Sequence, residues 1–124
     1  MSCCGTDGPV ITVYGLSNCD TCRKARRWLT DQGLQHRFHD VRTDGLDPVR
    51  VLEWLKSLGW ENVVNRRSST WRSLGPAERD GLDTQRAARL ILDHPVLIKR
   101  PLIDVDGQMG IGFDPERLTA LTGV

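Results

Sequence analysis

Residues 10–33 read VITVYGLSNCDTCRKARRWLTDQG, a stretch with the pattern of a buried strand followed by a helix. Residues 10–14 are β-branched or aromatic without a break and end at Gly15, which is typical of a strand buried on both faces. Asn18 is the predicted N-cap of a helix that ends at Gly33. Apolar side chains recur at helical spacing between these two residues: Cys22, Ala25, Trp28 and Leu29.

The next part of the chain predicts a second strand and a block of helices. Residues 34–41 alternate well enough for a strand, and the right-handed crossover rule makes it parallel to the first. Asp47 and Pro48 have the order of an N-cap and first helical residue, and that helix ends near Gly59. Residues 60–75 are basic and irregular. Two further helices are predicted, beginning at Pro76 and at a cap formed by Asp83 or Thr84.

The last third of the chain predicts a hairpin and a final helix. Residues 102–105 and 108–113 are strand-like and flank Asp106-Gly107, a dipeptide typical of a tight hairpin turn. Asp114-Pro115-Glu116 then has the order of cap, proline and early acid that begins a helix. The predicted order is therefore β-α-β, a helical block, and β-β-α.

Composition limits the classes of function. The 124 residues allow one domain, and 39% hydrophobic with 27% charged residues is typical of a globular protein. No apolar run approaches the ~20 residues of a membrane span. A net charge of +1 favours neither nucleic acid nor an anionic membrane. Residues 1–9 lack periodicity and a secretion signal, so we expect a disordered tail on a cytoplasmic, monomeric protein folded over residues 10–124.

Cys19-Asp-Thr-Cys22 is the candidate reactive site. A cysteine at the start of a helix meets unpaired backbone N–H groups and the positive end of the helix dipole, which favour its thiolate. In motifs of this kind the thiol pKa falls to roughly 3.5–7.5. We predict Cys19 as the nucleophile and Cys22 as the resolving thiol. Four basic residues that follow are expected to add positive potential: Arg23, Lys24, Arg26 and Arg27.

Two other interpretations of these cysteines stay open. The pair could be half of a zinc site, with Cys3 and Cys4 supplying two further sulfurs, although adjacent cysteines lack the usual ligand spacing. The thiols could also be inert, as we predict for Cys3 and Cys4 themselves. The place of the Cys19–Cys22 pair, after a strand and at a helix start, favours redox chemistry without a bound metal.

Four stretches of the sequence resemble the ArsC/Spx family of thioredoxin-fold proteins, and within it the YffB-like branch: VYGLSNCDTCRKARRWL, RFHDVRTDGLD, WENVVNRRSSTWRSL and HPVLIKRPLIDVDGQMGIGF. The likeness covers nearly everything after residue 9. It implies an α/β fold of the thioredoxin or glutaredoxin type. A mixed four-stranded sheet is expected, with a helical insertion at about residues 47–93 between the βαβ and ββα halves.

The resemblance also implies roles for single residues. Cys19 matches the family's nucleophilic cysteine, and Arg100 matches an arginine that stabilises the bound oxyanion and thiolate in arsenate reductases. Pro101 matches the cis-proline beside the active thiol, where freed backbone groups can pair with an extended thiol such as glutathione. Arg67 fits the pattern of the Spx and YffB branches. With Asn18 and Pro101, it completes the expected substrate-binding residues.

Two positions depart from the arsenate reductases that the sequence resembles. Asn65 stands at the place of another arginine of those enzymes, with Arg66 and Arg67 next to it. Gly112 stands about where their third anion-binding arginine falls, so that charge is missing. The resemblance therefore implies fewer fixed donors for arsenate.

The function expected from these residues is that of a glutathione-linked thiol-disulfide oxidoreductase or ArsC-like reductase. It needs no bound cofactor, because glutathione is the co-substrate. The first rival function is a Spx-like redox sensor that binds RNA polymerase without touching nucleic acid itself. The sequence also leaves open an arsenate reductase and a binding domain without redox activity.

Overall fold

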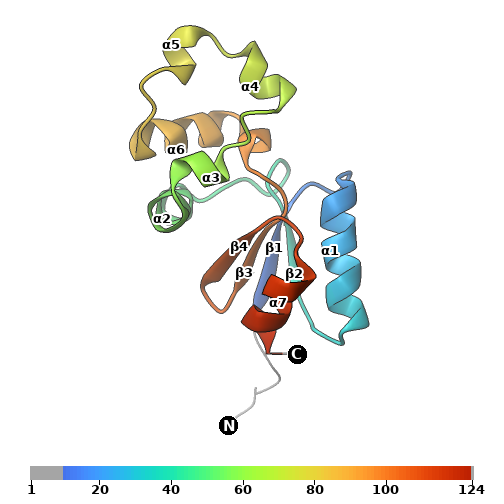
Figure 1. Cartoon of the computed structure of the whole chain (residues 1–124). Helices are drawn as coiled ribbons and strands as arrows, with labels where there is room; N and C mark the ends of the chain where they lie inside the picture. Colours follow the sequence, from blue (N-terminus) through green and yellow to red (C-terminus); the bar gives the residue numbers. More distant parts are fainter. Residues whose placement is uncertain (1–9, 124) are drawn as a thin grey trace. The chain divides into compact units, whose positions relative to one another are not determined.

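The structure, a computed structural model, describes residues 10–123, so the predicted tail at residues 1–9 lies outside the described residues. The chain divides into two compact units (Figure 1). The first unit runs up to Asp40 and resumes at Arg100, and the second comprises Val41–Lys99. The insertion predicted at about residues 47–93 lies within the second unit.

The first unit contains a mixed four-stranded sheet in the order β2-β1-β3-β4. β1 (Ile11–Gly15) is parallel to β2 (Arg37–Asp40) and antiparallel to β3 (Leu102–Val105), and β3 is antiparallel to β4 (Gln108–Ile111). This confirms the predicted α/β sheet and its parallel βαβ pair. β2 and β4 are shorter than predicted.

Two helices cover one face of this sheet, α1 (Asp20–Asp31) and α7 (Pro115–Thr122) (Figure 1). Alternate residues of β1 and β3 point to this face and meet the apolar stripe of each helix. The buried cluster consists of Ile11, Val13, Ala25, Leu29, Ile103, Val105 and Leu118. This core fixes α1 relative to β1, and with it the short turn that joins them.

The hairpin between β3 and β4 follows the sequence prediction. Asp106 and Gly107 have φ angles of 52° and 90°, the left-handed values that a tight hairpin turn requires at both central positions. The Asp104 side chain accepts a hydrogen bond from the Gly107 N–H at 2.7 Å. The turn lies at the end of the sheet where β1 begins, since Ile11 pairs with Val105.

The second unit is helical. It contains α2 (Pro48–Leu58), α3 (Trp60–Val63), α4 (Ser69–Ser73), α5 (Pro76–Arg79), α6 (Thr84–Asp93) and the 3-10 helix η1 (Pro95–Leu97). α2 and α6 pack together through their apolar stripes. No helix among residues 10–123 is both long and apolar enough to cross a membrane.

The prediction of an irregular segment at residues 60–75 is wrong in part, because α3 and α4 form there. The Ser68 hydroxyl accepts a hydrogen bond from the Trp71 N–H at 3.1 Å and caps α4. A bridge between Val64 and Ile98 holds the segment from the other side. A single serine cap and a contact distant in sequence carry no periodic signal, so hydrophobic spacing misses both helices.

Candidate active site

Cys19 stands at the junction between β1 and α1. It is the N-cap of α1, with an extended backbone (φ −99°, ψ 121°), so the prediction of Asn18 as the N-cap is wrong by one residue. Asn18 lies instead inside a turn that the Cys19 N–H closes on the Leu16 carbonyl at 3.2 Å. Asparagine is a favoured N-cap residue, so a prediction from residue type places the helix start at Asn18, one position before the true N-cap. Helix boundaries are uncertain by a residue or two for this reason.

The electrostatics at Cys19 favour its thiolate. Partial burial raises the pKa of the Cys19 thiol, but three neighbouring groups outweigh it: the Cys22 backbone N–H, the Cys22 thiol and the Arg100 guanidinium. The net pKa therefore lies below its ordinary value. The Cys19 side chain does not form an N-cap hydrogen bond. The backbone N–H of Cys22, the third residue of the helix, nevertheless favours the Cys19 thiolate.

Cys22 has the opposite environment one turn further on. Its side chain is 0% exposed, and burial is the largest cause that raises the pKa of its thiol to about 12. The hydrogen bond to Cys19 and the charge of Cys19 raise it further, whereas the Leu16 backbone and Arg100 lower it. Both cysteines are free thiols. Near neutral pH, Cys22 is thus a proton donor toward Cys19.

Gly15, the last residue of β1, lets the Cys22 sulfur lie where it does. A Cβ added to Gly15 would overlap the Cys22 sulfur, and it would also approach Phe38 at 3.7 Å. The backbone of β1 therefore passes directly against the thiol. Sequence reasoning treats Gly15 only as the end of a strand and misses this close approach.

Arg100 belongs to the first unit and lies just before β3. The Arg100–Pro101 peptide bond is cis, as the family resemblance implies. Pro101 is buried, and its carbonyl accepts a hydrogen bond from the Gly112 N–H at 2.8 Å. Hydrogen bonding to the Arg100 guanidinium and its positive charge both lower the pKa of the Cys19 thiol, so the first unit brings Cys19, Cys22 and Arg100 together.

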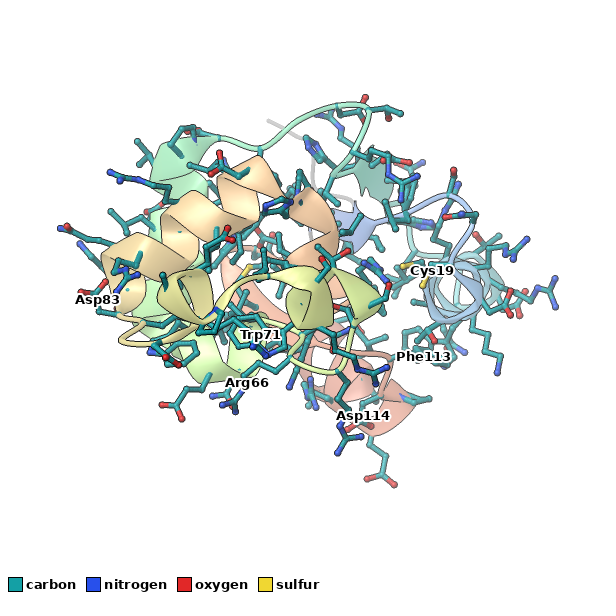
Figure 2. All side chains as sticks on the ribbon, turned by 90° about the horizontal axis from the view of Figure 1, so that it is seen from above. Cys19, Arg66, Trp71, Asp83, Phe113 and Asp114 are labelled. Atoms are coloured by element: carbon teal, nitrogen blue, oxygen red, sulfur yellow. The ribbon has the colours of Figure 1, made fainter. Side chains whose placement is uncertain are left out.

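The remaining predicted residues divide between the two units. Asn18 is exposed on the turn before Cys19, which Figure 2 labels at the start of α1. Arg67 belongs to the second unit, between α3 and α4, where its N–H donates to the Asn65 side chain at 3.0 Å. Its neighbour Arg66 lies over the ring of Trp60, with 5.7 Å between the guanidinium carbon and the ring centroid.

Two of the basic residues on α1, Arg23 and Arg26, have partners of their own. Arg23 forms an ion pair with Asp20 in the first turn, and the Arg26 guanidinium lies 4.2 Å from the centroid of the Phe38 ring. The cation that lowers the pKa of Cys19 is Arg100. Within residues 10–123, no three His, Cys, Asp or Glu side chains gather in a way that could hold a metal ion, and Cys3 and Cys4 lie outside that range.

Asp40 is a further residue of this region that the sequence does not single out. It ends β2, pairs in register with Gly15, and is 9% exposed. One of its carboxylate oxygens accepts a hydrogen bond from the Ser17 N–H at 3.3 Å. An aspartate at the end of a predicted strand, level with the turn of its parallel neighbour, is the signal that could have found it.

A thioredoxin-like α/β fold with two cysteines at the start of its first helix defines a class of thiol proteins. The model of the ArsC family matches residues 14–121, and the chain belongs to this family.

Known relatives agree with this assignment. A Haemophilus influenzae protein is 43% identical over 111 residues, which are 90% of this chain and 97% of that protein. The global transcriptional regulator Spx of Streptococcus agalactiae is 31% identical over 113 residues, covering 90% of this chain and 82% of the regulator.

Two solved structures have the same fold. The YFFB protein is 35% identical with a TM-score of 0.87, and the match covers 91% of this chain and 99% of that one. An arsenate reductase related protein from Brucella melitensis is 39% identical with a TM-score of 0.73, and the match covers 94% and 97% of the two chains. The neighbours of this chain therefore include proteins named for arsenate reductase and for Spx.

Proposed function

We propose that this protein is a glutathione-linked thiol-disulfide oxidoreductase with Cys19 as its nucleophile. The observation that carries the proposal is the opposite state of two neighbouring thiols: the pKa of Cys19 is lowered and that of Cys22 is raised to about 12. Because the thiolate and not the thiol attacks sulfur, only Cys19 is prepared for nucleophilic attack near neutral pH.

The reaction takes place in two exchanges. The Cys19 thiolate attacks the glutathionyl sulfur of a glutathionylated substrate, the S–S bond breaks, and a mixed disulfide of Cys19 and glutathione forms. The substrate sulfur leaves as a thiolate and takes a proton from water. A second glutathione thiolate then attacks the glutathionyl sulfur on Cys19 and releases oxidised glutathione and the Cys19 thiolate. The sum of the two exchanges releases the substrate thiol and converts its glutathionyl group and one free glutathione into oxidised glutathione, so one disulfide is exchanged for another.

Arg100 supports both exchanges. Its guanidinium stabilises the Cys19 anion before the first attack and again when that anion leaves in the second. A planar guanidinium can also pair with a carboxylate in two hydrogen bonds, and glutathione carries two carboxylates. The residue thus suits a substrate that is itself an anion.

An external thiol, and not Cys22, is the better candidate for the second exchange. At pH 7 a thiol with a pKa of about 12 is ionised in about one molecule in a hundred thousand. A mixed disulfide on Cys19 would remove the Cys19 charge and so lower the Cys22 pKa, but burial, the largest cause, would remain. Glutathione in solution has no such burial to overcome.

Mass spectrometry after exposure to oxidised glutathione tests this proposal. Cys3 and Cys4 are replaced by serine throughout, and the protein is compared with and without Cys19→Ser or Cys22→Ser. We expect one glutathionyl group on Cys19 both in the protein with an intact pair and in Cys22→Ser, and no rapid labelling in Cys19→Ser.

Two other outcomes of this experiment would contradict part or all of the proposal. If Cys22 resolves, the protein with an intact pair forms an internal disulfide and loses two hydrogens, and only Cys22→Ser retains glutathione. Equal and slow labelling of both serine variants would contradict the proposal, because Cys19 would then have no special reactivity.

A redox-sensing regulator is the second candidate function, and the likeness to Spx over 90% of the chain favours it. In this case the Cys19–Cys22 pair would control binding to RNA polymerase rather than turnover. A pull-down with purified polymerase, with the pair reduced or oxidised, separates the two functions. Stable capture that depends on the redox state, without turnover of glutathionylated substrate, would favour the regulator.

Arsenate reduction is the third candidate, and membership of the ArsC family favours it. Against it stands Gly112, which has a φ of +80° and no side chain at the position of an expected anion-binding arginine. Oxidation of glutathione that depends on added arsenate and on Cys19 is the test. No such dependence is expected.

A further inference from the structure

Asp40 is the one residue among positions 10–123 that is both buried and polar or charged. Burying a carboxylate is costly unless hydrogen bonds compensate it, so packing alone does not account for an aspartate here. It lies at the end of β2, beside the end of β1, and its Oδ2 accepts the Ser17 N–H at 3.3 Å.

Ser17 occupies a decisive place in the chain. The turn from Leu16 to Cys19 is closed by the Cys19 N–H on the Leu16 carbonyl at 3.2 Å. Ser17 is the second residue of this turn, and its N–H points to Asp40 and not into the turn's own hydrogen bond. The closing hydrogen bond thus joins the two ends of the turn, and Asp40 bonds the second residue of the turn to β2.

This turn sets the position of the reactive sulfur. Cys19 follows it directly, and the groups that favour the Cys19 anion come from elsewhere, the Cys22 amide from α1 and the guanidinium of Arg100 from the start of the ββα half. These groups act over hydrogen-bond distances, so a small displacement of the turn weakens them. Asp40 is not itself one of the groups that shift the Cys19 pKa.

We propose that Asp40 is a positioning residue for Cys19: its carboxylate holds the Ser17 amide and thereby fixes the turn that places the Cys19 sulfur against the Cys22 amide and Arg100. The inference rests on the proposed function in that it assumes a reactive thiolate at Cys19. It adds a residue from β2 that acts on the nucleophile through the backbone.

The pH profile of Cys19 alkylation tests this inference. Iodoacetamide labelling of Cys19 is followed by peptide mapping across pH, with Cys3 and Cys4 replaced by serine. Asp40→Ala removes the acceptor, and we expect the Cys19 pKa to rise by about one unit, so that alkylation slows about tenfold on the acid side of the profile. Asp40→Asn keeps a carbonyl acceptor and is expected to retain most of the rate.

Asp104→Ala is the matched control. Asp104 also accepts a turn amide, the Gly107 N–H at 2.7 Å, but at the opposite end of β1. Its loss is expected to lower stability without moving the Cys19 profile. An Asp40→Ala protein that is folded and has an unchanged profile would overturn the inference, as would an Asp40→Asn profile shifted as far as that of Asp40→Ala.

Amide hydrogen exchange in the unsubstituted chain keeps the inference testable if Asp40→Ala does not fold. The Ser17 N–H is expected to exchange more slowly than in an unfolded chain, and exchange at the unfolded rate would overturn the role of Asp40. Failure of the proposed function is seen separately: in that case Cys19 of the parent protein already has an ordinary pKa.

Discussion

The start of α1 differs from the starts of α2, α6 and α7 in the residue that stands at the N-cap. Asp47, Asp83 and Asp114 cap the latter three, and each side chain accepts a backbone N–H from the first turn, at 3.0, 2.8 and 3.1 Å. Cys19 is the N-cap residue of α1, and its side chain accepts no capping hydrogen bond.

One physical effect serves two purposes at these helix starts. Unpaired amides and the helix dipole attract an anion to every helix start. A permanently charged aspartate converts this attraction into stability, about 1 kcal/mol per cap. A thiol converts it into a lowered pKa, and the helix gives up part of the capping energy. The hydrogen bond from the Ser17 N–H to Asp40 is a second interaction that holds the chain at the start of α1.

Cys19→Asp gives α1 the same N-cap residue as α2, α6 and α7, and it is expected to have the largest effect on reactivity. α1 would receive the cap of the other helices, so the free energy of unfolding should be unchanged or higher by up to about 1 kcal/mol. Labelling by oxidised glutathione at this site should disappear. Denaturant unfolding and mass spectrometry measure the two effects.

Cys19→Ala serves as the control for that variant, since it removes the thiol without adding a cap. It should be equally unreactive and less stable than Cys19→Asp. Rapid glutathionylation of Cys22 in either variant would show that the nucleophile had been assigned to the wrong cysteine.

Arg100→Ala separates the effect of the helix start from that of Arg100, which favours the Cys19 thiolate in addition to the backbone amide of Cys22. Its loss removes a hydrogen bond and a positive charge that favour the Cys19 thiolate, so the Cys19 pKa should rise. The alkylation profile should shift to higher pH, with a rate about tenfold lower on its acid side for a shift of one unit. Arg100→Lys should shift it less.

Linkage gives this prediction a second readout. A thiol with a lowered pKa in the folded state stabilises the fold above its unfolded pKa, and this contribution is lost as pH falls through the folded pKa. The rise of stability with pH in that window should shrink in Arg100→Ala. Arg23→Ala, which removes an exposed cation paired with Asp20, is the control and should leave both readouts unchanged.

Local signals predict much of this fold. Asp47-Pro48 and Asp114-Pro115 begin helices where the sequence places them, and the Asp106-Gly107 turn has the predicted geometry. Each of these features depends on a few consecutive residues whose side chains bond to their own backbone. The family resemblance adds the mixed four-stranded sheet and the helical insertion, which local signals do not contain, and the order of the strands comes from the structure.

The electrostatic relations of the site depend on contacts between distant residues. Spacing alone does not bring Arg100 to Cys19, and it does not reveal that Asp40 accepts the amide of Ser17. The burial of Cys22 against Gly15, which separates the two thiols in pKa, also requires the packed structure. A Cys-X-X-Cys pattern therefore predicts where chemistry takes place, but the assignment of a proton to each sulfur comes from tertiary structure.

Gly15→Ala tests the close approach of the β1 backbone to the Cys22 sulfur. It should change the stability of the protein more than the reactivity of Cys19. The new Cβ would overlap the Cys22 sulfur, and overpacking of this kind costs roughly 1–3 kcal/mol. In a Cys22→Ala background the space is open, so the cost of Gly15→Ala should largely disappear. A double-mutant cycle by denaturant unfolding measures this coupling, and additive costs would contradict the contact.

Asp83→Ala removes the N-cap side chain of α6, and the smallest effect is expected from it. The side chain accepts the Arg86 N–H at 2.8 Å at the start of α6, and its loss should cost about 1 kcal/mol of stability. The Cys19 alkylation profile should not change, since Asp83 is not among the groups that shift its pKa. An equal loss of stability in Cys19→Ala would mean that the thiolate caps α1 as well as a carboxylate caps α6. In that case α1 would give up no capping energy for its reactive residue.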